Sequence, residues 1–269
     1  SLTTLEYFEQ MQTFKLTPSG ASKDKFHFTI PTDIYQAQSL GGISAGYGAT
    51  FIILQGAPPR QIVVAYTEPD TPATSPDVRL LRGTTILEVD GEDLVNGDNV
   101  DTLNNGLFPG DNETHTFVVQ DTGEDSPRTI SMISTKVVSD PVQNVSTIET
   151  SSGVVGYMTF NDHIETAEAQ LIDAMTQLQT TGVDDLILDL RYNGGGFLDI
   201  ANELSFMIAG DPAVGRVFEE LEFNDQHLEF DPVTGRPLTP TKFHTTAQGF
   251  STPSGTPLPS LGLDRVFVL

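Results

Sequence analysis

The sequence predicts an α+β fold in which a partly open β-barrel precedes an incomplete α/β core. Two patterns predict this division. From Gly41 onward, short β-branched runs alternate with turn residues, which is typical of compact antiparallel sheets. From Gly153 onward, the order is strand, helix, strand, helix, which predicts parallel strands joined by right-handed crossovers.

Length and composition limit the function classes. With 269 residues and 38% hydrophobic content, the chain is long enough for two folded domains. Its 13 basic and 37 acidic residues give a net charge of −24, so neither nucleic acid nor anionic lipid is expected as a partner. The lack of cysteine excludes disulfides, thiolate catalysis and zinc–thiolate sites. No apolar run reaches the roughly 20 residues that span a bilayer, and no signal peptide is found at the start.

The first part of the chain, residues 1–40, is expected to be a helical lead-in. Apolar residues at helical spacing predict a short helix over residues 4–14. A proline at the start of residues 31–38 predicts a second helix there, because proline suits the first helical turn.

The barrel is expected within residues 41–138. Its predicted strands are residues 50–54, 61–65, 85–89, 114–120 and 129–135. Asp90-Gly91 predicts a tight turn directly after the third of these strands. Residues 96–107 are ambiguous, although their apolar positions fit one face of a helix.

The α/β core is expected within residues 139–269. Its predicted strands are residues 154–160 and 186–190, the second covered on both faces because it is almost entirely apolar. Asp162 is expected to cap a helix that ends at Gly182, and residues 198–208 are expected to form another helix.

The last part of the chain has a weaker pattern. Residues 218–230 predict a hairpin or a pair of strands, and the Pro-, Thr-, Ser- and Gly-rich residues 231–262 predict a long loop or lid. Residues 265–269 are expected to form a buried strand. A core strand at this position indicates a truncated domain.

The first candidate site is the glycine-rich turn at residues 193–196. It joins an apolar strand to a helix, so its backbone N–H groups and the positive helix end can stabilise an oxyanion. A dinucleotide fingerprint is excluded, because Asp199 stands where the third glycine is needed. The alternative is an ordinary tight turn between strand and helix.

The second candidate is Gly46-Tyr47-Gly48-Ala49, which leads into a predicted edge strand that begins with Thr50 and Phe51. Backbone amides in such a loop can hold a terminal carboxylate, while the strand pairs with the rest of a peptide. The alternative is a hairpin turn.

Other clusters carry less information. None of His27, His115, His163, His227 and His244 forms a pair at helical metal-ligand spacing, and His163 is expected at the surface. The acidic residues 90–93 and 98–101 do not fit an EF-hand, so solvated loops are expected. No convincing nucleophile is identified, and no metal or cofactor is expected.

Together, the two loops resemble the carboxyl-terminal processing peptidases, also called tail-specific proteases. These place a PDZ domain before a core of the ClpP/crotonase type. Their motif Asp-Leu-Arg-x-Asn-Pro-Gly-Gly is matched from Asp189 to Gly196, except that Gly194 replaces the proline. Residues 71–73 and 83–91 resemble two motifs of the PDZ part.

The resemblance implies catalysis by a Ser–Lys dyad, with serine as nucleophile and lysine as general base. Both residues are expected beyond this chain, so the chain alone is expected to be inactive. The amide of Gly195, or of its neighbour Gly196, is expected to stabilise the oxyanion. Asp189, Arg191 and Asn193 are expected to support this loop.

The resemblance therefore implies a serine endopeptidase of the periplasm or cell envelope. Its PDZ-like domain is expected to recognise a protein or peptide substrate with a free carboxyl terminus, using residues 46–51. Two alternatives stay open: a non-catalytic peptide-binding protein, and a crotonase-type acyl-CoA enzyme that shares the core fold.

Overall fold

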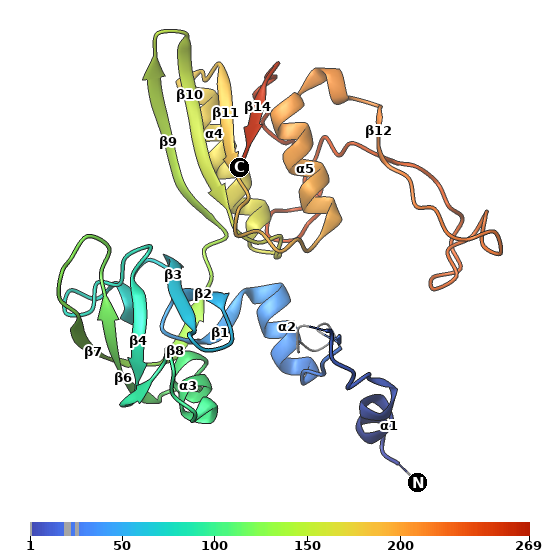
Figure 1. Cartoon of the computed structure of the whole chain (residues 1–269). Helices are drawn as coiled ribbons and strands as arrows, with labels where there is room; N and C mark the ends of the chain where they lie inside the picture. Colours follow the sequence, from blue (N-terminus) through green and yellow to red (C-terminus); the bar gives the residue numbers. More distant parts are fainter. Residues whose placement is uncertain (1, 19–22, 25–26) are drawn as a thin grey trace.

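The structure is a computed structural model that describes residues 2–18, 23–24 and 27–269. Within these residues it is a mixed α/β structure with five α-helices and two separate hydrophobic cores. One core is formed by side chains of a six-stranded sheet and of the short segments packed on it. The other lies between a four-stranded sheet and two helices (Figure 1). The predicted change from antiparallel strands to a strand–helix–strand–helix order is confirmed.

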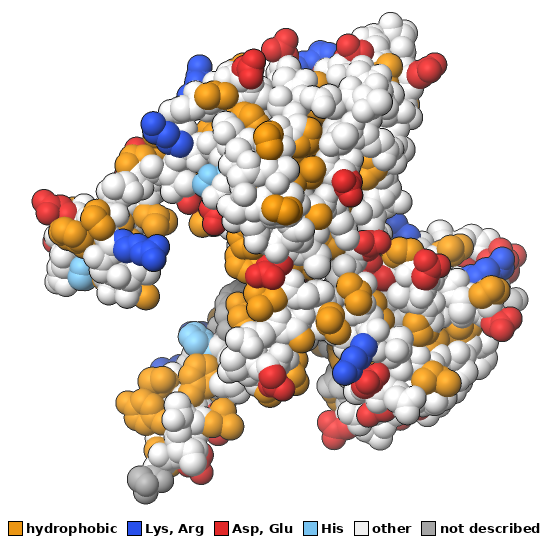
Figure 2. Space-filling model, turned by 180° about the vertical axis from the view of Figure 1, so that it is seen from behind, with side chains coloured by type: hydrophobic (Ala, Val, Ile, Leu, Met, Phe, Trp, Pro, Cys, Tyr) orange, Lys and Arg blue, Asp and Glu red, His pale blue; other side chains and the backbone are white. Residues whose placement is uncertain are grey.

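Two helices precede the sheets, as predicted. They are α1 (Thr4–Met11) and α2 (Thr32–Gly41). A capping box starts α1, because the Thr3 hydroxyl accepts from Glu6 N–H at 3.2 Å and the Glu6 carboxylate accepts from Thr3 N–H at 2.7 Å. Neither helix buries a residue, and hydrophobic side chains gather on the surface of this part of the chain (Figure 2).

The six-stranded sheet is antiparallel throughout, in the order β2-β3-β4-β6-β7 with β5 paired to β4. Its strands are β2 (Ala49–Gln55), β3 (Gln61–Thr67), β4 (Thr85–Val89), β5 (Glu92–Asp93), β6 (Thr114–Gln120) and β7 (Arg128–Ile133). The five predicted strands are confirmed. Asp90 and Gly91 form the predicted turn, with positive φ at both residues.

Further short elements surround this sheet. The ambiguous segment forms helix α3 (Val100–Leu107). The 3₁₀ helix η1 (Pro72–Thr74) follows β3. A two-stranded ladder of β1 (Ile43–Gly46) and β8 (Thr135–Val138) was not predicted. It joins the two ends of the region.

The second sheet has the order β14-β11-β10-β9. Its strands are β9 (Val142–Thr150), β10 (Gly153–Phe160), β11 (Asp185–Asp189) and β14 (Val266–Val268). The pairs β10–β11 and β11–β14 are parallel, whereas β9 runs antiparallel to β10. The sequence patterns did not predict β9.

Helices α4 (Ala167–Thr181) and α5 (Leu198–Ala209) pack on this sheet. Buried Leu186 and Leu188 face this packed layer, while Ile187 on the other face is only half-buried, so the prediction of two fully covered faces was too strong. Gly182 ends α4 in the left-handed conformation, as predicted.

The expected N-cap at Asp162 is wrong, because α4 begins after Thr166. The backbone of His163 forms a parallel bridge with Gly196 instead, through His163 N–H to Gly195 O at 3.1 Å and Phe197 N–H to His163 O at 2.9 Å. This pairing keeps the chain extended before the helix starts.

The expected hairpin within residues 218–230 is also wrong. β12 (Val217–Glu219) pairs with β13 (Thr241–Lys242) across a long arm. The arm turns at residues 231–236, where Asp231 N–H donates to Arg236 O and the Asp231 carboxylate accepts from two backbone amides. The residues that form the turn therefore come after the segment that was predicted as a hairpin. The arm extends away from the sheet (Figure 1).

The last predicted strand forms as β14, but its side chains are not buried. Val266, Phe267 and Val268 are 40%, 51% and 57% exposed. They remain exposed because β14 is the edge strand of the sheet and lies beyond the part that α4 and α5 cover. The prediction of a strand is therefore confirmed, and the prediction that it is buried is wrong.

Candidate oxyanion loop and peptide-binding edge

The glycine-rich turn lies at the carboxyl end of β11, between the ends of two parallel neighbours. On one side, β10 ends at Phe160. On the other side, Leu190 N–H donates to Leu269 O at 3.0 Å, and Leu269 N–H donates to Leu188 O at 3.0 Å. The main chain of Leu269 is therefore directly beside the start of the turn.

Asp189 anchors the start of the turn. Its carboxylate accepts two bonds from the Arg191 guanidinium, at 2.9 and 2.5 Å, and one from the Tyr157 hydroxyl of β10 at 2.9 Å. The carboxylate is buried, and the Arg191 guanidinium lowers its pKa to about 2. Asp189 is therefore ionised at neutral pH and ties the turn to two strands.

Asn193 holds the middle of the turn with both ends of its amide. Its side-chain NH₂ donates to Phe160 O at 2.8 Å. Its carbonyl oxygen accepts from Gly195 N–H at 2.8 Å and lies 2.9 Å from Nδ1 of His163. The structure thus brings Asp189, Arg191 and Asn193 together in one loop.

The three glycines differ in what they permit. Gly195 and Gly196 have φ of +93° and +138°, which disfavour a side chain. A Cβ on Gly196 would also lie 2.5 Å from His163 O, whereas a Cβ on Gly194 would meet nothing within 4 Å. Gly196 is therefore required at its position, whereas Gly194 has room for a Cβ.

The amide groups of these glycines differ in their partners too. Gly195 N–H is bound to the Asn193 side chain. The bridge to His163 uses atoms of Gly195 and Phe197, and Gly196 N–H makes no hydrogen bond to any residue that the structure describes. Of the two predicted donors, Gly196 is the one whose amide is free in this structure.

His163 was expected at the surface, and the structure corrects this. Its ring is half-buried against Phe160, with the two ring centroids 4.4 Å apart. Burial lowers the pKa of His163, although Asn193 and Asp162 act in the opposite direction. The missed signal was its place just after β10, at the same sheet edge as the glycine turn.

Tyr192 connects the turn to the six-stranded region. Its ring lies 5.5 Å from the ring of Tyr66 on β3, and the guanidinium of Arg82 lies 5.4 Å from its centroid. The turn therefore contacts both halves of the molecule.

The second glycine loop is held by its tyrosine. Tyr47 is 2% exposed, packs edge to face on Phe117, and donates from its hydroxyl to Gly106 O at 3.0 Å. Its side chain is therefore part of the core, and only its backbone can contact a ligand. Gly48 has a φ of +76° and packs so closely on Thr71 that a Cβ would clash.

Thr50 and Phe51 follow this loop in β2, the edge strand of the six-stranded sheet. Within the described residues, β2 pairs with β3 alone. An edge strand offers unpaired N–H and C=O groups to an added strand. The six predicted peptide-contacting residues, 46–51, are thus contiguous along one loop and one edge.

Two serine motifs were missed in the sequence. Residues 42–46 have the spacing Gly-x-Ser-x-Gly, but Ser44 lies in β1 after a helix, whereas a nucleophile elbow needs a strand followed by a helix. Ser22 and Lys25 have the spacing Ser-x-x-Lys, and both lie outside the described residues. The motif around Ser44 therefore lacks the structural context of a catalytic nucleophile.

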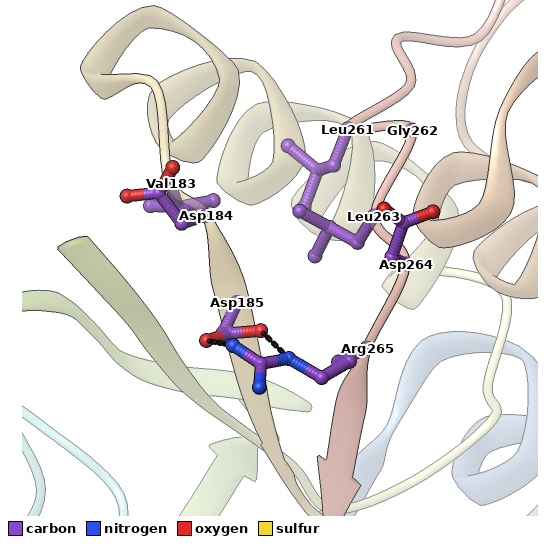
Figure 3. Close-up of a pocket in the computed structure, with 8 residues that line it drawn as sticks. All are labelled: Val183, Asp184, Asp185, Leu261, Gly262, Leu263, Asp264 and Arg265. Atoms are coloured by element: carbon purple, nitrogen blue, oxygen red, sulfur yellow. Dashed lines mark hydrogen bonds and ion pairs between the residues drawn. The ribbon is translucent and has the colours of Figure 1, made fainter. Parts of the chain in front are cut away.

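No cluster of three or more His, Asp or Glu side chains that could hold a metal ion occurs in residues 2–18, 23–24 and 27–269. The pocket in Figure 3 lies at the amino end of β11, away from the glycine turn. There Arg265 donates to both carboxylate oxygens of Asp185, at 2.9 and 2.7 Å. This pair connects the starts of β11 and β14.

Comparison with known proteins agrees with the predicted resemblance. Residues 154–229 match peptidase family S41. A carboxyl-terminal-processing protease of Picosynechococcus sp. is 28% identical over 149 residues, which cover 52% of this chain and 36% of that protein. The chain thus matches little more than a third of this relative's length.

A similar fold occurs in a crystal structure of a putative S41 protease from Bacteroides fragilis. The TM-score is 0.58 at 20% sequence identity, and the match covers 97% of this chain and 70% of that chain. This likeness concerns the fold, and it extends over both sheets.

Proposed function

Because the chain carries a peptidase family S41 domain over residues 154–229, we propose that it forms the first part of a serine endopeptidase of the carboxyl-terminal processing type. The observation that carries this proposal is the position of the glycine turn beside Leu269. In this proposal a nucleophile directly after β14 lies at the carboxyl ends of the parallel strands, where the free amide of Gly196 also lies. An oxyanion hole needs this proximity of nucleophile and N–H donor.

In this proposal the serine and the lysine are supplied by sequence beyond Leu269. The lysine accepts the serine proton, the serine oxygen attacks the scissile carbonyl, and the amine leaves with a proton to give an acyl-enzyme. Gly196 N–H donates to the tetrahedral oxyanion. Asp189, Arg191 and Asn193 hold the loop around it.

The six-stranded region supplies substrate recognition in this proposal. We assign residues 1–40 to a helical lead-in, 41–138 to a PDZ-like domain and 139–269 to the peptidase core. Backbone amides of the loop from Gly46 to Ala49 bind a terminal carboxylate, and the preceding residues of the substrate pair with the free edge of β2. The substrate is a protein or peptide with an accessible, unfolded carboxyl terminus.

A periplasmic or cell-envelope location is also part of the proposal, and it rests on the family resemblance. No helix within the described residues has the length and apolar character that crossing a bilayer requires.

The test uses the gene product that contains residues 1–269 together with the sequence after Leu269. We expect it to cleave an unfolded protein with a free carboxyl terminus, to lose this activity with a serine-directed inhibitor, and to cleave the same protein with an amidated terminus about tenfold less efficiently. Residues 1–269 alone are expected to be inactive. Binding of the free terminus without any cleavage would support a non-catalytic peptide-binding protein instead.

A further inference from the structure

His163 contacts the glycine turn through both its backbone and its imidazole ring. Its backbone N–H donates to Gly195 O at 3.1 Å, and its backbone oxygen accepts from Phe197 N–H at 2.9 Å. Its oxygen and Cβ also fill the space that a side chain on Gly196 would need. The backbone of His163 thus determines the path of the chain on both sides of Gly196.

The imidazole acts on the same turn through Asn193. The orientation of the Asn193 amide is fixed by its other partners, because its NH₂ donates to Phe160 O at 2.8 Å and its oxygen accepts from Gly195 N–H at 2.8 Å. The Asn193 side-chain oxygen therefore faces Nδ1 of His163 at 2.9 Å, and because this oxygen can only accept, Nδ1 must carry the proton. In the neutral ring, Nε2 then has no proton.

These bonds form a chain from the imidazole to the glycine amides. The Asn193 oxygen receives Nδ1–H and Gly195 N–H together, which turns the Gly195 amide inward. Gly196 N–H is left without a partner in the part of the chain that the structure describes. Of the two expected donors, Gly195 and Gly196, only Gly196 therefore keeps an amide that can bind an oxyanion.

We propose that His163 is a positioning residue that selects Gly196 N–H as the oxyanion donor by holding Asn193 against the Gly195 amide. This inference rests on the proposed peptidase function, because it assigns a role within the same loop. Removal of the Nδ1–H donor takes away one of the three hydrogen bonds that hold the Asn193 amide, so the hold of Asn193 on Gly195 N–H weakens. The loop then samples several amide orientations, and the donor is no longer pre-organised for the transition state.

Two substitutions separate the hydrogen bond from the packing of the ring. H163N places an amide NH₂ close to the position of Nδ1, so it keeps the donor. H163F keeps an aromatic ring against Phe160 but removes the donor. H227F makes the same change in the arm between β12 and β13, far from the turn, and serves as the matched control.

The experiment measures peptide hydrolysis by the gene product that includes the sequence after Leu269. For H163F we expect kcat to fall by about 10- to 100-fold with KM changed less than about twofold, because the oxyanion forms only in the transition state. H163N and H227F are expected to keep kcat within about threefold of the parent protein. Unchanged kcat in folded H163F, or a loss in H163N as large as in H163F, would overturn the inference.

A second measurement does not depend on activity. In ¹⁵N spectra of residues 1–269, we expect the protonated Nδ1 tautomer of His163, and the Gly195 amide is expected to exchange with solvent about tenfold faster in H163F than in H163N. If the longer protein shows no peptidase activity, the proposed function fails while this result still tests the loop. Equal exchange in the two variants, or a proton on Nε2 in place of Nδ1, contradicts the positioning role.

Discussion

The two glycine loops are held by different physical means, and the difference reflects the regions in which they lie. The loop at Gly46–Ala49 depends on one aromatic side chain buried in an apolar core. The loop at Asn193–Gly196 depends on hydrogen bonds that begin at Asp189, Asn193 and His163. Apolar burial fixes a loop without regard to protonation, whereas a polar network fixes the direction of single N–H groups.

The regions around the loops also differ in their buried carboxylates, because four of the five among the described residues lie in the four-stranded region and only Glu68 follows β3. In the four-stranded region, the buried polar residues include the carboxylates Glu168, Asp185, Asp189 and Glu203. Glu168 accepts from four backbone N–H groups in residues 248–252, at distances of 2.7 to 3.0 Å. The long loop that follows β13 is therefore attached to the core through charge, and this region is expected to respond to pH.

The largest effect is expected from Y47A, which removes the aromatic anchor of the first loop. Truncation of a fully buried aromatic ring destabilises a fold by about 4 kcal/mol. Y47F keeps the ring and loses only the hydroxyl bond to Gly106 O, at a cost of about 1 kcal/mol. Urea unfolding, monitored by NMR signals of the six-stranded region, measures the loss of stability in both variants. Similar losses in the two variants would show that the hydroxyl, and not the ring, anchors the loop.

A smaller but still large effect is expected from G196A in the second loop. The added Cβ meets His163 O and must adopt a φ of +138°, so the free energy of unfolding should fall by about 3 kcal/mol. G194A is the matched control, because its Cβ meets nothing within 4 Å, and a change below about 0.5 kcal/mol is expected. Thermal unfolding compares the pair. Equal stability of the two variants would contradict the contact with His163.

The smallest effect is a loss of stability at alkaline pH. Burial, together with the nearby Glu168 carboxylate, raises the pKa of Glu203 from 4.5 to about 8. The folded state therefore holds a proton that the unfolded state has already lost, so stability falls as pH rises from about 5 to 8. We expect stability to decrease by about 2 kcal/mol between pH 6 and pH 8.

E203Q tests this pH dependence. The glutamine keeps an oxygen for Gln248 N–H, which Glu203 accepts at 2.7 Å, and offers a permanent donor toward Glu168. Its stability should change little between pH 5 and 8 in urea unfolding. The same slope with pH in the parent protein and in E203Q would assign the effect to another group.

The sequence was sufficient to predict an element where the apolar residues of that element have a regular spacing. The strands at residues 85–89 and 114–120 form with the predicted bounds, because their alternating side chains face a core. β9 escaped prediction because most of its side chains are exposed and polar, so its structure depends on pairing with β10 and not on a local apolar pattern. β1 and β8 are short and mostly exposed, and they pair across about 90 residues of intervening chain, which no local pattern reveals.

The candidate site was predictable to a similar degree. The motif around Asp189, Arg191 and Asn193 identified the loop, since these residues are close in sequence. His163 carries no motif, and its role follows from the parallel pairing that places the ends of β10 and β11 side by side. The inward direction of the Gly195 amide likewise depends on a side chain from the same turn, which composition alone does not specify.

The ion pair between Arg265 and Asp185 has a consequence at the opposite end of the sheet. β14 pairs through three residues, and Leu269 adds two backbone bonds at its end, so few contacts hold its register along β11. A slide of one residue would exchange the two faces of the strand and shift its end by about 3.3 Å. The bidentate pair at one end thus adds to the contacts that set, four residues later, which backbone atoms of Leu269 meet the glycine turn.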